Sequence, residues 1–179
     1  MAIGGIAGMV DPNVNLWIDS CSVEDCTING AIAVGGILGG GTVYSMTQIT
    51  NSHNRNTKVT TSYNCAGGIV GYADTLYVYS CSNNGTIKGA ASTTAPPGNL
   101  PANSIYNVGT GGIAGGSGLS TIISSRNSGT VQGSRGVGGI IGSTLVTTQP
   151  RSYPHYTIYK RQVAPHRIIL LYNCRPYST

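Results

Sequence analysis

Hydrophobic residues recur along the chain in short runs that are separated by Gly, Asn, Ser and Thr. The clearest repeated unit is the pentapeptide Gly-Gly-Ile-x-Gly, which occurs five times. Its copies begin at Gly4, Gly35, Gly67, Gly111 and Gly138, so that successive copies start 31, 32, 44 and 27 residues apart. A recurring period of this length is typical of solenoids and other repeat architectures.

A second element lies between the pentapeptides. It consists of a short extended segment, an Asn/Gly turn and the pattern Thr-apolar-x-Gly, and its best copies span 79–89 and 124–133. The first interval contains a looser copy with one extra residue between its halves, and the copy at 50–60 is the most degenerate. Short β-branched runs bounded by Gly and Asn indicate strands and turns.

The two elements together predict an all-β fold, a parallel β-helix (β-solenoid) of about 27–32 residues per coil with three short strands in each coil. An antiparallel sandwich does not require a repeated sequence, and a propeller blade needs about 40 residues or more, so both alternatives are less favoured. In a solenoid the pentapeptide isoleucines form one interior column, and each buried Ile contributes about 1.5–3 kcal/mol. The predicted column contains Ile6, Ile37, Ile69, Ile113 and Ile140.

The glycines and asparagines have a structural explanation in this fold. Gly permits sharp corners and close approach of neighbouring backbones. The turn residues Asn83, Asn84 and Asn127 tolerate left-handed backbone and can hydrogen-bond. Stacked on one another, they would form an amide ladder along an edge of the solenoid.

Two departures from the period divide the chain. The 44-residue interval contains 90–104, rich in Ala, Thr and Pro, which we interpret as a loop inserted into one repeat. The repeat solenoid is therefore assigned to 1–143. The remaining segment, 144–179, has no Gly and is rich in Pro and Tyr, and it is either a terminal cap or an extension foreign to the natural protein.

The net charge of +5 belongs to this tail. Half of the ten basic residues lie in it without any acid, whereas the body is neutral. Tyr153, Tyr156 and Tyr159 with Lys160 and Arg161 could form a basic aromatic patch for nucleic acid or glycan. The basic balance of the whole chain does not by itself indicate a nucleic-acid-binding protein.

Composition narrows the possible classes further. Charged residues make up 8% of the chain, against about 25% in ordinary globular proteins, and 40% are hydrophobic, which favours an ordered fold over disorder. The longest apolar run has five residues, far short of the roughly 18 that a membrane span needs. No signal peptide is visible, and the chain opens inside a repeat, so we expect a fragment of a longer protein.

The cysteines are few and irregularly spaced. We expect mostly buried free thiols, with a local Cys21–Cys26 pair as the alternative. The odd number leaves at least one thiol unpaired. The five cysteines are Cys21, Cys26, Cys65, Cys81 and Cys174.

The repeats resemble the GLUG-motif repeats of bacterial surface and adhesin-like proteins, including parts of some IgA-peptidase-type proteins. Gly68–Gly71 and Asn83–Gly89 carry the resemblance most closely, and it extends over about Gly4–Ser143. Ile stands where the family name implies Leu. The resemblance implies an extracellular or cell-surface location and supplies no catalytic residues.

Candidate catalytic chemistry is sparse. Glycoside hydrolysis needs two carboxylates about 5–9.5 Å apart, and lyases of this fold gather acids around Ca²⁺. Here Asp19, Glu24 and Asp25 fall in the first coil and Asp74 two coils later, with no apparent pair on adjacent coils. We therefore expect no enzyme, with no catalytic, cofactor-binding or metal-binding residues.

Other motifs are equally weak as functional signals. His53, His155 and His166 are scattered, and Cys21-x₄-Cys26 lacks a partner pair for a metal. Asn84-Gly85-Thr86 is a formal glycosylation sequon, but it coincides with the turn of the repeat.

Three functions follow, in order of preference. The first is a non-enzymatic extracellular repeat module, a structural spacer or adhesin-like surface region. Its expected partners are host or cell-surface proteins or glycans, or neighbouring repeats of a longer parent chain. The second is a fragment of a polysaccharide-active β-helix enzyme, and the third is a binding module that acts through the basic tail.

Overall fold

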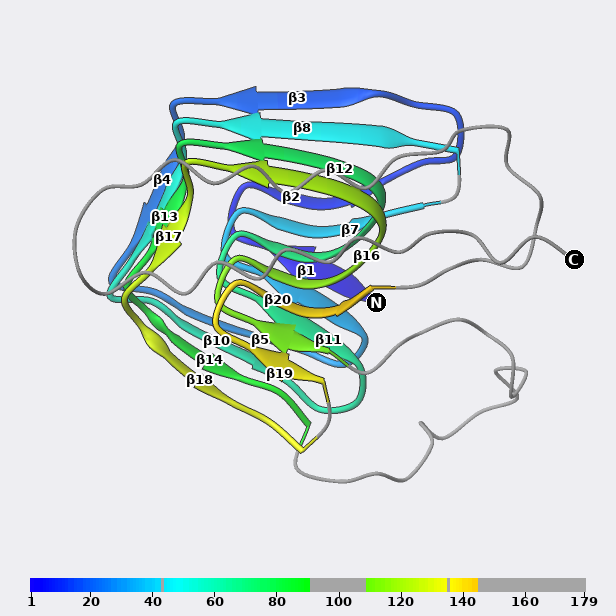
Figure 1. Ribbon diagram of the computed structural model, residues 1–179. Coiled ribbons are helices and arrows are strands. Elements are labelled where there is room, and N and C mark those ends of the chain that lie inside the picture. Colours follow the sequence, from blue (N-terminus) through cyan, green and yellow to red (C-terminus); the bar gives the residue numbers. More distant parts are fainter. Residues whose placement is uncertain (43, 91–108, 135, 145–179) are drawn as a thin grey trace, which may run out of the picture.

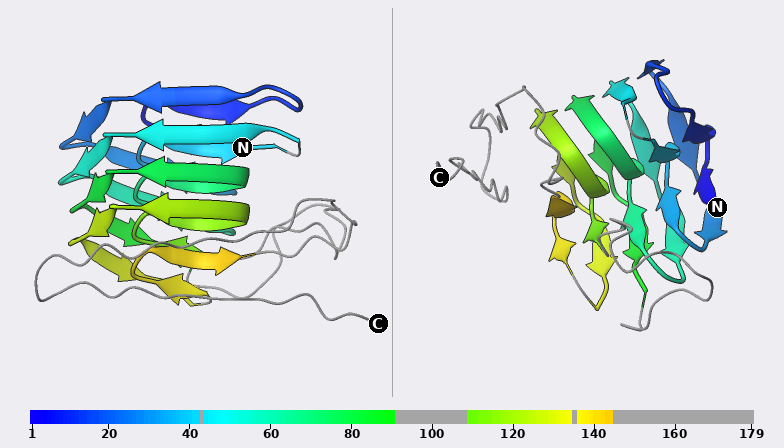
Figure 2. Two further views of the ribbon diagram at one scale, coloured as in Figure 1. Left: turned by 45° about the horizontal axis from the view of Figure 1, so that its top comes forward. Right: turned by 90° about the vertical axis from the view of Figure 1, so that its right-hand side faces the viewer.

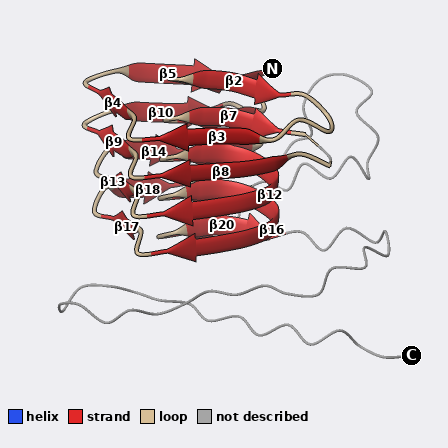
Figure 3. Ribbon diagram, turned by 90° about the horizontal axis from the view of Figure 1, so that it is seen from above, coloured by secondary structure: helices blue, strands red, loops and turns tan. Residues whose placement is uncertain are grey.

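The computed structural model describes residues 1–42, 44–90, 109–134 and 136–144. All the regular structure in these ranges is β-strand, and every strand pair is parallel (Figure 3). Successive coils stack on one another, from the blue first coil to the yellow last one (Figure 2). The parallel β-helix predicted from the repeat is confirmed.

The described chain forms four coils and the start of a fifth (Figure 1). Coil 1 contains β1 (Ala2–Gly4), β2 (Ala7–Val10), β3 (Leu16–Asp19), β4 (Ser22–Glu24) and β5 (Thr27–Gly30). Coil 2 contains β6 (Ala33–Gly35), β7 (Leu38–Gly41), β8 (Met46–Thr50), β9 (His53–Arg55) and β10 (Lys58–Thr61).

In coils 3 and 4 a single long strand takes the place of the two sheet B strands of the earlier coils. Coil 3 contains β11 (Cys65–Gly67), β12 (Val70–Tyr79), β13 (Ser82–Asn83) and β14 (Thr86–Lys88). Coil 4 contains β15 (Thr110–Gly111), β16 (Ala114–Ile123), β17 (Arg126–Asn127) and β18 (Thr130–Gln132), and β19 (Val137–Gly138) and β20 (Ile141–Thr144) begin coil 5.

Equivalent strands of successive coils form four sheets, which we call A to D in chain order. Sheet A is β1-β6-β11-β15-β19, sheet B is β2-β7-β12-β16-β20 with β3 and β8 added beside β12, sheet C is β4-β9-β13-β17 and sheet D is β5-β10-β14-β18. Each complete coil thus crosses four sheets, one more than the three strands predicted. The reason is that the pentapeptide bends at its centre, so that it ends a strand of sheet A and begins one of sheet B.

The register follows the sequence repeat. Sheet A pairs Ala2 with Ala33, Ala33 with Cys65, Ala66 with Thr110 and Thr110 with Val137, which reproduces the offsets of 31, 32, 44 and 27 residues. The long third interval therefore places its extra residues between β14 and β15. The predicted insertion at 90–104, apart from Ala90, and the tail after Thr144 lie outside the described residues.

The pentapeptide isoleucines stack as predicted. The Ile6, Ile37, Ile69 and Ile113 amides each donate to the carbonyl of the next isoleucine in the column, at 2.8–3.0 Å. The three central side chains are fully buried, whereas Ile6 is 49% exposed and Ile140 is half-buried, because in the described part of the chain the first and last coils have a paired coil on one side only. The column is part of one hydrophobic core that runs the length of the stack.

A left-handed residue marks the corner between sheets B and C in every complete coil. Ser20, Asn51, Ser80 and Ser124 have φ of 55°, 48°, 53° and 51°. Short polar residues tolerate this conformation better than other residues with a Cβ. The corner therefore repeats although the residue type does not. Among the described residues, no helix is long and apolar enough to cross a membrane.

Candidate functional site

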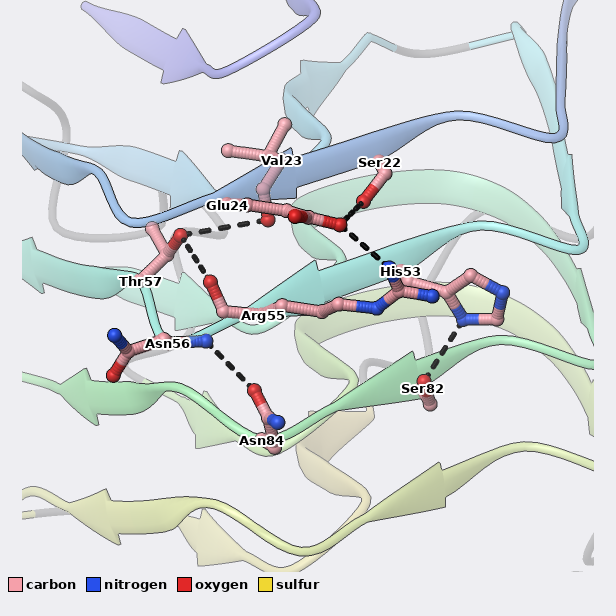
Figure 4. A network of polar contacts seen from close by, with 9 residues as sticks. All are labelled: Ser22, Val23, Glu24, His53, Arg55, Asn56, Thr57, Ser82 and Asn84. Atoms are coloured by element: carbon pink, nitrogen blue, oxygen red, sulfur yellow. Dashed lines mark hydrogen bonds and ion pairs between the residues drawn. The ribbon is translucent and has the colours of Figure 1, made fainter.

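Sheet C carries the densest set of polar side chains, divided between its two faces. Residues alternate between faces along a strand. Val23, Asn54, Asn83 and Asn127 form one column in register. Their neighbours on either side occupy the outer face, which Figure 4 shows from close by.

The inner column is an amide ladder. Asn54 Nδ2 donates to Asn83 Oδ1 and Asn83 Nδ2 donates to Asn127 Oδ1, each at 2.7 Å. Asn54 and Asn83 are fully buried, so the ladder lies inside the solenoid and not along an edge as predicted. The prediction identified Asn83 and Asn127 correctly, missed Asn54 in the degenerate second copy, and wrongly included Asn84, which is exposed.

The ladder also holds the corner between sheets C and D. Asn83 Oδ1 accepts from the Gly85 amide at 3.1 Å, and Asn127 Oδ1 accepts from the Gly129 amide at 3.0 Å. Asn54 Oδ1 faces the position of Val23 and has no hydrogen-bond partner among the described residues. Because the other amide atoms of these bonds are engaged within the fold, the ladder stabilises the stack and offers no ligand site.

A second ladder uses Cys and Ser at the corner between sheets B and C. The Cys21 amide donates to Ser52 Oγ at 3.2 Å, the Ser52 amide to Cys81 Sγ at 3.5 Å and the Cys81 amide to Ser125 Oγ at 3.1 Å. Sequence reasoning missed this column because it alternates between two residue types. The only signal was that Cys21, Cys81 and Ser125 each follow a Ser in the second element of the repeat.

None of the four described cysteines forms a disulfide. Cys65 and Cys81 are buried as expected, but Cys21 is half-buried and Cys26 is exposed. Burial raises the pKa of Cys65 to about 12 and the pKa of Cys81 to about 11. These two thiols are structural residues of the core, since a neutral buried thiol is unreactive. Cys174 lies outside the described residues.

The outer face of sheet C contains an ion pair that joins coils 1 and 2. Arg55 Nη1 lies 2.6 Å from Glu24 Oε1, and Ser22 Oγ donates to the same oxygen at 2.7 Å (Figure 4). The hydrogen bonds from Ser22 and Arg55 lower the pKa of Glu24. Glu24 is therefore an ionised surface carboxylate, which does not suit a general acid.

Asp19 and Asp25 make similar contacts at neighbouring corners. Asp19 accepts hydrogen bonds from Thr50 Oγ1, from Asn51 Nδ2 at 2.9 Å and from Ser20 Oγ at 2.9 Å, in that order of effect in lowering its pKa. Asp25 accepts from Asn56 Nδ2 at 2.6 Å. Each of these first-coil acids thus binds side chains of the second coil.

Asp74 is placed differently from the other candidate acids. It is buried in β12, and its Oδ2 accepts from the Tyr44 amide at 3.1 Å. The carboxylate therefore supports the loop between β7 and β8. The structure brings Asp74 together with backbone of coil 2, and places it on a different coil and sheet from Glu24 and Asp25.

The remaining candidates are dispersed. His53 Nδ1 lies 2.8 Å from Ser82 Oγ on the outer face of sheet C. His155 and His166, like the tyrosines and basic residues of the predicted tail patch, lie outside the described residues. In the described part of the chain, no three His, Cys, Asp or Glu side chains gather as a metal site. Asn84 of the sequon is exposed, and its Oδ1 accepts from the Asn56 amide at 2.7 Å.

Most of the outer contacts of sheet C connect neighbouring coils, as the Arg55–Glu24, His53–Ser82 and Asn56–Asn84 contacts do, whereas the Ser22–Glu24 hydrogen bond lies within one strand. Of the acids weighed as candidates for chemistry, Asp19, Glu24 and Asp25 form cross-coil contacts. Comparisons with protein-family models, with curated proteins and with solved structures find no match to this chain.

Proposed function

We propose that the chain is a non-enzymatic extracellular repeat module, a structural spacer or adhesin-like region of a cell surface. The observation that carries this proposal is the uninterrupted parallel stack, in which the same corners and interior columns recur from coil to coil. In such a stack each coil contacts only its neighbours, so the length of the module grows with the number of coils.

The use of polar groups supports a spacer. Buried amides form the interior ladder, and the first-coil acids bind side chains of the second coil. These contacts connect coils without assembling a catalytic constellation. A rigid stack with side chains in ordered rows on its outer faces is well suited to holding or displaying a binding surface.

The edge of coil 1 supports neighbouring repeats as a partner. Among the residues that the structure describes, β1 to β5 each have a paired strand on one side only. Apolar side chains are exposed on this coil, whereas the terminal capping repeat of a solenoid has a polar outer surface. They are Ile6, Met9, Val14 and Trp17, which are 48–62% exposed. With its unpaired strand edge and exposed apolar side chains, coil 1 resembles the surface by which an interior coil packs against the next coil.

The resemblance to GLUG-motif repeats is the support for the location. The test is surface labelling of intact source cells with an antibody against the described coils, combined with protease treatment of those cells. We expect antibody binding that protease removes. Detection of the parent protein only in the cytosolic fraction would refute the proposed location.

A turnover assay tests the non-enzymatic part of the proposal. The chain is incubated with a panel of polysaccharides, and release of reducing ends is measured for the unchanged protein and for Asp19→Asn and Asp74→Asn. We expect no release above background. Turnover that either substitution abolishes would replace the proposal with the β-helix enzyme.

A further inference from the structure

The outer face of sheet B has a surface that the spacer role leaves unused. It is formed by β3, β8, β12 and β16, which lie side by side in continuous register (Figure 1). Leu76 and Val78 of β12 are buried while Thr75, Tyr77 and Tyr79 are partly exposed, so alternate residues of these strands face outward. We call the outward side chains of these four strands the sheet B face.

Two aromatic residues of this face, Trp17 and Tyr77, stand on one row across the strands, and a third, Tyr79, stands on the neighbouring row. Pairing of Trp17 with Gln48, of Gln48 with Tyr77 and of Tyr77 with Thr121 places these four side chains in a line along the stack. Trp17 is 62% exposed, and Tyr77 is partly exposed between its flanking coils. With strands about 4.8 Å apart, the backbone positions of the two aromatic residues lie about 10 Å apart along the row.

The rows on either side combine hydroxyl-bearing and apolar side chains and contain a single charged one. A second row pairs Asp19, Thr50, Tyr79 and Ile123, and a third pairs Met46, Thr75 and Leu119. Asp19 is the one acid on these rows, and Thr50 and Asn51 already bind its carboxylate. The face therefore has no charge complementarity for a polyanion or a polycation.

We propose that the sheet B face binds a neutral, extended β-linked polysaccharide that lies along the stack, with sugar rings packed on Trp17 and Tyr77. This inference rests on the proposed surface role and names its ligand class. The separation of the two aromatic rings is comparable with the repeat of two sugar units in an extended β-1,4-linked glycan. The C–H faces of such sugars pack on aromatic rings, and their hydroxyls can bond to Gln48, Thr75 and Thr121 between and beside the rings.

A protein partner fits this face less well. Protein interfaces gather their aromatic anchors in a contiguous, desolvated centre. Here Gln48 separates the two rings of the main row, and the flanking rows alternate threonines with apolar residues, so polar groups divide the apolar area. A linear ligand with alternating apolar faces and polar edges matches that division.

The test is binding of the purified chain to insoluble cellulose and chitin, measured by depletion from solution, with insoluble starch as the α-linked comparison. Trp17→Ala and Tyr77→Ala should each weaken binding to the β-linked polymer by about tenfold. Tyr63→Ala, an aromatic truncation in the turn between β10 and β11, is the matched control and should leave binding unchanged. Circular dichroism melting confirms that each variant is folded.

A spacing variant makes the test sharper. Gln48→Tyr combined with Tyr77→Ala retains two aromatic residues but reduces their separation from two strands to one. We expect it to bind as weakly as Tyr77→Ala. Restored binding, equal binding to starch, or no binding of the unchanged chain to either β-linked polymer would overturn the inference.

The surface role and the glycan inference fail separately. A chain located on the cell surface that binds proteins through Trp17 and Tyr77, and neither glycan, would refute only the ligand class. A cytosolic chain would refute the surface role, whatever its binding to cellulose or chitin in solution.

Discussion

Single residues in this fold act through their equivalents in the next coil. Asn83 is the central example, since it receives a hydrogen bond from Asn54 and donates one to Asn127 while also accepting from the Gly85 amide. A buried amide that loses such partners pays the full cost of desolvation. Substitutions of single residues therefore test how much the interior ladder contributes to stability.

Asn83→Ala should destabilise the protein by about 2–4 kcal/mol, because it removes the acceptor of the buried Asn54 Nδ2 and the hydrogen bond that Asn127 Oδ1 accepts from Asn83. Asn84→Ala, an exposed neighbour of the same type, should cost less than about 1 kcal/mol. Urea unfolding followed by circular dichroism measures both. Equal losses from the two substitutions would mean that the ladder contributes no stability of its own.

The acids Asp19 and Glu24 predict a dependence of stability on pH. Hydrogen bonds lower the folded-state pKa of both carboxyls from ordinary values of 3.8 and 4.5. A lowered folded-state pKa gives stability that is present above the unfolded-state pKa and is lost as pH falls through the folded-state pKa. Melting temperature should therefore fall as pH drops below about 4.

The double variant Asp19→Asn, Glu24→Gln should reduce that acid dependence. Asp11→Asn, in the loop between β2 and β3, is the control for removing a carboxylate. If the double variant keeps the pH profile of the unchanged chain, the contacts of these acids do not affect stability.

The cysteines should separate by reactivity. In a Cys174→Ser background at pH 8, a thiol reagent should modify Cys26 within minutes, and Cys65 and Cys81 only after unfolding, because burial raises the pKa of both core thiols. Mass spectrometry of peptides from labelled native and denatured protein assigns each site. Rapid native labelling of Cys65 would contradict the packed core.

At the scale of elements, the pentapeptide forms a bend at which the backbones of neighbouring coils lie close together. A Cβ on its second glycine, Gly36, Gly68 or Gly112, would collide with a backbone carbonyl of the following coil and with the ladder asparagine. The second glycine therefore provides the space in which the amide ladder stands. This relation joins two motifs that lie some 15 residues or more apart in the sequence.

Gly68→Ala should destabilise the protein by about 2–4 kcal/mol, because the Cβ would overlap Gly112 O and the Asn83 side chain. Gly139→Ala is the matched control at the same repeat position, since nothing lies within 4 Å of its added Cβ. The control should change stability by less than about 0.5 kcal/mol. Similar effects at both glycines would show that the glycine serves the bend alone and not the ladder.

At the scale of the whole molecule, coils 2 and 3 are each paired with a coil on both sides, whereas coil 1 is paired on one side only among the described residues. The Ser20, Asn51 and Ser80 amides occupy the same corner in coils 1, 2 and 3. Each donates to a backbone carbonyl of the next coil at 3.0–3.1 Å, and the acceptors are Thr50, Tyr79 and Ile123. Because the three hydrogen bonds have nearly the same length, a difference in exchange rate among these amides reflects the stability of the coil and not the strength of the bond.

Native-state hydrogen exchange should therefore be slower for the Asn51 and Ser80 amides than for the Ser20 amide, by about 100-fold after correction for intrinsic rates. Coil 1 can separate from the stack by losing one interface, whereas coils 2 and 3 each have two. Nuclear magnetic resonance at residue resolution measures this. Uniform exchange at the three corners would indicate that the stack opens only as a whole.

The coil period, the isoleucine column and the parallel stacking follow from the amino-acid sequence alone. Each is a periodic property, and in a solenoid the period along the chain becomes the register between coils. The sequence also identified Asn83 and Asn127 as members of one ladder, because their surroundings repeat.

Positions that are equivalent in the fold but differ in residue type were recognised only in the three-dimensional structure. It placed Asn54 inside the ladder, alternated Cys with Ser at a corner and added a fourth strand by bending the pentapeptide. It also aligned Trp17 with Tyr77, two coils away, on one outer row. The physical reason is that backbone hydrogen bonds and steric space select a position, and at such a position side chains of different types meet the same geometric requirement.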